Sequence, residues 1–135
     1  MQQPIRNSLA DKYLVFFRVL LYLYTVLLFV ATLIPVSVIR GNQESWLDFL
    51  AFSYSDKLIH FLLFFILTCL LSVSYCFTKK LHYFLIPFGI GLLIECLQHM
   101  MMSGRTFEIW DVAANTAGTA TAYFLLIKRP VRNDT

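Results

Sequence analysis

The chain has 135 residues, of which 59% are hydrophobic and 14% are charged, and its formal net charge is +3. A water-soluble domain of this length cannot bury so much apolar surface, so lipid must solvate part of the chain. The mean hydropathy of +0.68 agrees with this, and the absence of a basic stripe interleaved with aromatic residues excludes nucleic-acid binding. The composition predicts an integral membrane protein.

A transmembrane helix needs about 20 apolar residues, because each residue adds ~1.5 Å and the hydrocarbon core is ~30 Å thick. Apolar runs of about this length recur along the chain. We expect four of them, at about residues 19–39, 58–77, 81–102 and 112–127. The last is short, and Trp110 and Lys128 are expected to extend it into the two interfaces. The fold class is therefore all-α, a membrane-embedded bundle of four helices, and residues 1–135 are expected to form one domain.

The orientation is predicted from lysine and arginine, which are retained on the cytoplasmic side of transmembrane helices. They cluster before the first run, between the second and third, and after the fourth: Arg6, Lys12, Arg18, Lys79, Lys80, Lys128, Arg129 and Arg132. These positions alternate with the two remaining loops and fall on one side. Both termini are thus expected in the cytoplasm, and the chain is expected to cross the bacterial cytoplasmic membrane several times.

Polar residues gather at the opposite, outer end of the expected bundle. They come from three helices and one loop: Asp56, Lys57 and His60, then Glu95 and Gln98, then Arg105, Asp111 and Asn115. Helical spacing puts Asp56 and His60 on one face, and likewise Asp111 and Asn115. Glu95 is expected ~10 Å below the end of its helix. A carboxylate at such depth costs on the order of 2.5–3.5 kcal/mol, which favours a functional role over a purely structural one.

The fourth run also carries small residues at a spacing of four. Ala114, Gly118 and Ala122 form one row, and Ala113, Ala117 and Thr121 form the adjoining row. Small side chains let helix backbones approach closely in lipid, so this surface is expected to be a packing face.

Several of these segments together resemble the VanZ-like family. The resemblance is carried by Asp56-Lys57-Leu58-Ile59-His60-Phe61, Glu95-Cys96-Leu97-Gln98, Arg105 to Asp111 and Asn115-Thr116-Ala117-Gly118, in that order, between about Ser55 and Phe124. It implies a small polytopic bacterial membrane protein. The namesake of the family is associated with resistance to the glycopeptide teicoplanin, so an effect on glycopeptide sensitivity is one expectation.

The outer cluster is expected to bind or act on an envelope lipid or a lipid-linked cell-wall intermediate. Glu95 and His60 would be the titratable, candidate catalytic pair, and Lys57 and Arg105 would hold an anionic head group. The remaining residues of the cluster would orient these groups: Asp56, Gln98, Asp111 and Asn115. Neither a metal nor another cofactor is expected, and binding and catalysis are both compatible with this set.

Two other classes are kept as alternatives, and a third is disfavoured. In a structural or assembly protein, the polar cluster would only hold the helices together. A small multidrug exporter has a similar length, but its membrane glutamate lies in the first helix, and the run from Val19 to Ile39 has no charge. A haem held by His60 and His99 is disfavoured because His99 points about 100° away from its neighbour Gln98.

Overall fold

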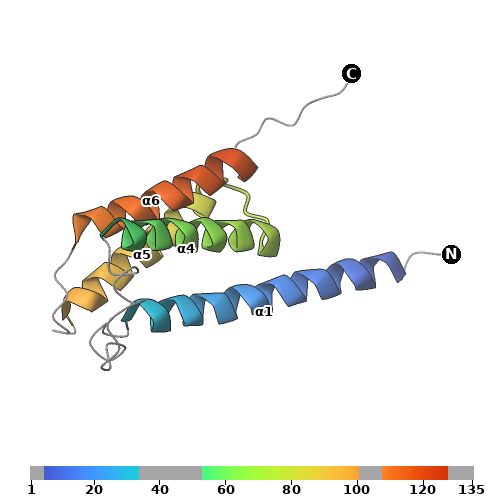
Figure 1. Ribbon diagram of the computed structural model, residues 1–135. Coiled ribbons are helices and arrows are strands. Elements are labelled where there is room, and N and C mark those ends of the chain that lie inside the picture. The colour runs from blue at the N-terminus through green and yellow to red at the C-terminus, as the bar shows by residue number, and fades with distance from the viewer. Residues whose placement is uncertain (1–4, 34–52, 101–107, 128–135) are drawn as a thin grey trace, which may run out of the picture.

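The computed structural model describes residues 5–33, 53–100 and 108–127, which form four α-helices and one short π-helix (Figure 1). The helices are α1 (Ile5–Leu33), α4 (Ser53–Ser74), α5 (His82–Met100) and α6 (Ile109–Ala122), and α6 continues into the π-helix η1 (Tyr123–Ile127). These ranges contain no strand, so the all-α prediction is confirmed for them.

Three of the helices are long and apolar enough to cross a membrane. The qualifying segments are Asp11–Leu33, Asp56–Ser74 and His82–Met100. Many of their large apolar side chains lie on the outside of the bundle, among them Leu23, Leu62 and Leu93. Such a surface suits hydrocarbon chains and not water. The protein is therefore a membrane protein by the character of these helices.

The first helix starts earlier than its apolar run. We expected a start at Val19, but α1 already begins at Ile5. No proline or glycine follows Ile5 before the helix reaches Leu33, so the backbone can stay helical through the polar segment that contains Asp11 and Lys12. Apolar runs predict where a helix enters lipid and not where it starts. The expected end at Ile39 lies outside the described residues.

The other boundaries differ by a few residues. The second helix, α4, ends at Ser74 and not at Phe77, because the backbone after it is held by a tyrosine of α5. The Tyr83 hydroxyl donates to the Tyr75 carbonyl oxygen at 2.7 Å and accepts from the Phe77 amide at 2.9 Å. The fourth helix begins at Ile109, three residues before the expected Val112, with Glu108 as its N-cap.

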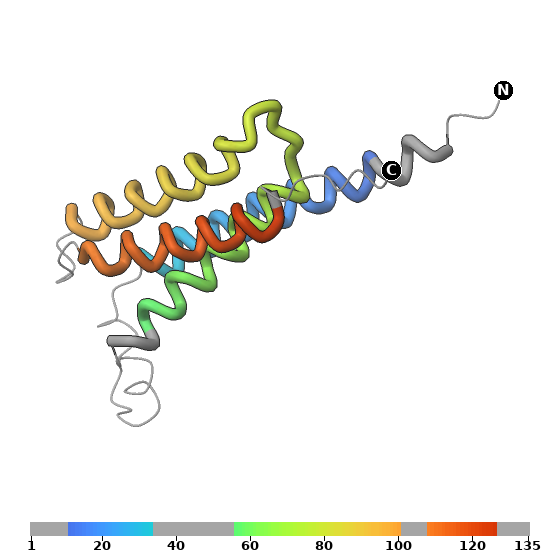
Figure 2. The backbone as a smooth tube through the Cα atoms, turned by 90° about the horizontal axis from the view of Figure 1, so that it is seen from above, coloured from blue at the N-terminus to red at the C-terminus, as the bar shows by residue number. Residues whose placement is uncertain are grey.

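Helix α4 lies at the centre of the bundle and packs against α1, α5 and α6. Figure 2 shows α5 and α6 side by side, with α1 passing behind α6. Among the described residues α1 has no contact with α6. The buried apolar core is centred on Phe64, Leu67 and Leu71 of α4, which meet Leu28 of α1 and Ile94 of α5.

The closest approach in the bundle is between α4 and α6, at Gly118. A β-carbon on Gly118 would overlap the Phe61 carbonyl oxygen and would lie 3.1 Å from the Phe65 amide nitrogen. The expected packing row is thus confirmed at Gly118 and at Ala122, which is also buried. The adjoining row is not a packing face, since Ala113 and Ala117 are exposed.

Chain direction brings four helix ends together at one end of the bundle. The last turn of α1, the first turn of α4, the last turn of α5 and the first turn of α6 all lie at the left of Figure 1. The start of α1 and η1 lie at the other end. There Arg18 donates from Nε to the Ser74 carbonyl oxygen at 3.2 Å, and its guanidinium stacks 5.0 Å from the centre of the Tyr75 ring.

Candidate functional site

The polar cluster predicted from the sequence forms at the end where the four helices meet. His60 of α4, Glu95 of α5, and Asp111 and Asn115 of α6 are all buried there. Asp56 and Asp111 lie in the first turns of their helices, where a negative charge is stabilised by the free backbone N–H groups. Gly118 shares the buried face of α6 with Asp111 and Asn115, so its close contact with Phe61 also presses these two residues against α4.

Lys57 is surrounded by carboxylates. Its Nζ donates to Glu108 Oε2 at 2.7 Å and to Asp111 Oδ1, and it lies 3.8 Å from Asp56 Oδ2. Lys57 keeps 23% of its side chain exposed and Asp111 only 11%. One ammonium group thus faces three carboxylates. The sequence predicts that Lys57 holds an anionic head group, and in the structure its ammonium group already pairs with these carboxylates.

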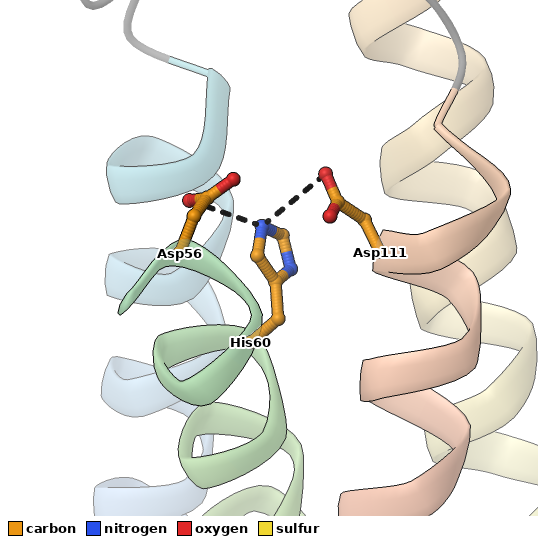
Figure 3. Close-up of side chains that lie close together, drawn as sticks. All are labelled: Asp56, His60 and Asp111. Carbon is orange, nitrogen blue, oxygen red and sulfur yellow. Dashed lines mark ion pairs between the residues drawn. The ribbon is translucent and has the colours of Figure 1, made fainter. Parts of the chain in front are cut away.

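His60 bridges α4 and α6 with both ring nitrogens (Figure 3). Its Nδ1 lies 3.0 Å from Asn115 Oδ1, and an amide oxygen can only accept, so Nδ1–H is the donor. The other nitrogen, Nε2, points toward two carboxylates, at 3.9 Å from Asp56 Oδ1 and 3.8 Å from Asp111 Oδ2. The three atoms lie within 4.8 Å of one another and could ligate a metal ion.

Glu95 is the most deeply buried acid of the cluster. Its side chain is 1% exposed, and Oε1 has no hydrogen-bond partner among the described residues. Its electrostatic partners are Asp111, His60 and Glu108, and its carboxylate also accepts from the Glu108 backbone. Burying a carboxylate oxygen without a donor is costly. Glu95 thus lies in the interior of the bundle, with His60 and Asp111 as its electrostatic neighbours.

The remaining predicted residues are not equivalent. Gln98 is buried, and its Nε2 donates to the Thr32 carbonyl oxygen at 2.7 Å, so it ties α5 to the end of α1. Arg105 lies outside the described residues. His99 is exposed, and this agrees with the expectation that it points away from Gln98.

Glu108 belongs to the cluster although we did not predict it as a site residue. Its carboxylate holds Lys57 from the position just before α6, and it makes no side-chain cap of that helix. In the sequence Glu108 stands three residues before Asp111. Residues at this spacing share one face of a helix, and this pattern could have predicted that Glu108 joins the cluster.

A separate, apolar groove of about 310 Å³ opens between α1, α4 and α5. Leu21, Leu67, Leu71, Ile86, Pro87 and Ile90 are among the residues that line it. Leu67 is seven residues after His60 in α4, so the groove begins about 10 Å from the polar cluster along the helix axis. The groove can hold a hydrocarbon chain but offers no chemistry of its own.

Comparison with known proteins gives one match. A sequence model of the VanZ/LLP1 family aligns with residues 13–129, which include all the polar positions described above. No curated protein and no solved structure shows significant similarity to the chain.

Proposed function

The chain belongs to the VanZ/LLP1 family, and we propose that it is a four-span protein of the bacterial cytoplasmic membrane whose polar cluster binds an envelope lipid on the extracytoplasmic side. Three spans have the required length and hydropathy. The fourth would be α6, whose 14 residues continue into the five of η1. Together they form a helical rod of about 28 Å, close to the hydrocarbon thickness.

The distribution of basic residues supports this orientation. Lys12, Arg18, Lys79 and Lys80 lie toward the end of the bundle that is opposite the polar cluster. Positive charges near transmembrane ends are retained in the cytoplasm, so the cluster would face outward and both termini inward.

The observation that carries the proposed function is Glu95. A buried carboxylate with an unpartnered oxygen, beside His60 and Asp111, adds nothing to helix packing that an amide or an apolar residue could not supply. Such groups in membrane proteins normally face a ligand or an aqueous path. In the proposed orientation Asp56, Lys57 and Asp111, in the first turns of α4 and α6, would lie near the outer head groups, and Glu95 would lie deeper. The ligand we propose is therefore a phosphate-bearing envelope lipid or a lipid-linked cell-wall intermediate.

The apolar groove supports a lipid over a water-soluble ligand. A head group at the polar end would leave its acyl or isoprenoid chain free to run toward Leu67 and Leu71, where the groove begins. Burial of a hydrocarbon chain contributes about 25 cal/mol per Å² when the chain comes from water. A lipid chain comes from the bilayer, which is itself apolar, so the groove would select the shape of the chain and add little affinity. Affinity would come from the head group.

Arg105 is the cation that we assign to the anionic head group, because Lys57 is held by Asp56, Glu108 and Asp111. A guanidinium can bind a phosphate through two parallel hydrogen bonds. Glu95 and His60 would be the titratable pair, and Asn115 would orient His60. Through an effect on the availability of the lipid-linked precursor, the protein would alter sensitivity to glycopeptides.

The experiment is native mass spectrometry of the protein purified in mild detergent from a bacterial membrane. Wild type should retain a phospholipid or a polyprenyl phosphate, and Arg105→Ala should lose most of it. Arg132→Ala, which removes the same charge beyond the end of η1, should retain the lipid and serves as the control. If wild type carries no lipid above the level of Arg105→Ala, the cluster holds helices together and the alternative of a structural protein stands.

A further inference from the structure

Two aspartates divide their oxygens between a lysine and a histidine. Asp56 turns Oδ2 to Lys57 and Oδ1 to His60, and Asp111 turns Oδ1 to Lys57 and Oδ2 to His60. The ion pairs with Lys57 therefore leave one oxygen of each aspartate directed at His60 Nε2 (Figure 3). His60 Nε2 lies 3.9 Å from Asp56 Oδ1 and 3.8 Å from Asp111 Oδ2. Both distances are too long for a direct hydrogen bond.

The tautomer of His60 makes this arrangement unfavourable without a positive charge. Since Nδ1–H donates to Asn115 Oδ1, the neutral ring has its lone pair on Nε2. A lone pair that faces two carboxylate oxygens is repelled by both. A histidine that ligates a metal through one ring nitrogen typically donates its other ring N–H to an oxygen atom, which fixes the orientation of the ring. Nδ1–H of His60 makes such a bond to Asn115 Oδ1.

We propose that Asp56 Oδ1, His60 Nε2 and Asp111 Oδ2 bind a divalent transition-metal ion, of the Zn²⁺ class. An imidazole with two carboxylates suits Zn²⁺ better than Mg²⁺, which prefers oxygen ligands alone. Ligand atoms of a tetrahedral zinc ion lie about 3.3 Å apart, so the two distances from His60 Nε2 to the carboxylates, 3.9 and 3.8 Å, must each shorten by about half an ångström, and the two aspartate oxygens, which lie within 4.8 Å of each other, must also approach. Asp56, which is 42% exposed, provides the open side through which the ion enters.

Glu95 gives independent support for a cation at this point. Its Oε1 is buried and unpartnered, and its electrostatic partners include Asp111 and His60, two of the three ligands. An ion between these ligands would offset the repulsion between Glu95 and Asp111.

The inference deepens the proposed function, on which its biological meaning rests. A metal ion held by two aspartates and one histidine keeps at least one open position, and a lipid phosphate oxygen is a ligand for it. The metal would then supply the positive charge that Lys57, already paired, does not.

Calorimetric titration of the chelator-treated full chain in detergent with Zn²⁺ tests the site without any lipid. Wild type should bind one ion per chain, and Asp56→Asn should weaken binding at least tenfold. Asp56 is partly exposed, so this variant is expected to fold. Asp11→Asn and His99→Ala are the controls, since both residues are exposed and neither belongs to the site, and both variants should bind as wild type does.

The outcomes separate the metal site from lipid binding. Absence of saturable Zn²⁺ binding by wild type, or equal losses in Asp56→Asn and the two controls, would overturn the proposal. If lipid is retained by wild type although Zn²⁺ does not bind, the proposed function stands and the metal site fails. If Zn²⁺ binds as expected and no lipid is retained, the metal site stands and the proposed ligand fails.

Discussion

Gly118 of α6 touches the backbone of α4 at Phe61, with so little space that a β-carbon would overlap the Phe61 carbonyl oxygen. Gly118 lies on the same buried face as Asp111 and Asn115. The contact between the two backbones therefore sets how closely these polar side chains approach His60. Helix packing and the geometry of the polar cluster are coupled through this one position.

A methyl group at Gly118 should force α4 and α6 apart. Gly118→Ala is expected to lower the free energy of unfolding by about 1–3 kcal/mol, the usual cost of overpacking. The measurement is thermal unfolding in detergent, followed by circular dichroism. Gly89→Ala is the matched control, because a β-carbon at Gly89 meets no atom within 4 Å. It should be neutral or stabilising by up to about 1 kcal/mol, and equal destabilisation by both variants would contradict the close packing at Gly118.

Lys57 is expected to hold the polar end of the bundle together. Lys57→Met keeps the unbranched side chain up to the position of the ammonium group but leaves Asp111, which is 11% exposed, without its ammonium partner. Removal of one partner from a buried ion pair costs on the order of 3 kcal/mol. The same thermal unfolding should show little change for Lys12→Met, since Lys12 is exposed near the start of α1. A wild-type melting curve for Lys57→Met would mean that the ion pairs are not formed.

The proposed orientation predicts which positions react from outside the cell. In a background with Cys69, Cys76 and Cys96 replaced, single cysteines at Glu44 and Thr106 should react with a membrane-impermeant thiol reagent in intact cells. A cysteine at Lys79 should react only after the membrane is opened, because Lys79 belongs to the opposite end of the bundle. Labelling of position 79 in intact cells would reverse the orientation.

The sequence predicts the helices well and their ends less well. Runs of apolar residues mark α4 and α5 within a few residues, because the bilayer requires about twenty apolar residues in a helix. The start of α1 at Ile5 was missed, since hydropathy does not report on a helix that continues into water. The early end of α4 depends on Tyr83 of the next helix, a tertiary contact that local sequence does not encode.

The membership of the polar cluster could be predicted, but the pairing within it could not. Helical spacing brings Asp56, His60, Asp111 and Asn115 to one end of the bundle, as expected. The choice of partners depends on the rotation of α6 against α4, which is fixed by Gly118. The sequence therefore does not predict that Lys57 pairs with Glu108 and Asp111. The hydrogen bond from Gln98 to α1 depends in the same way on how α5 packs against α1, which the sequence does not encode locally.

Glu95→Gln separates a working site from one that only joins helices. The amide keeps the shape of the side chain and can still hydrogen-bond, and it removes a buried acid, so the variant should insert normally and melt at or above the wild-type temperature. If Glu95 acts on a lipid ligand, Glu95→Gln should nevertheless fail to return the glycopeptide sensitivity of a deletion strain to the wild-type level, whereas the wild-type gene does so. Thr119→Val is the control and should complement fully, because Thr119 is also a buried polar residue but lies eight residues after Asp111, about 12 Å further along α6. A Glu95→Gln variant that is stable and also complements fully would remove the functional role of Glu95, and a variant that fails to insert would favour the purely structural role.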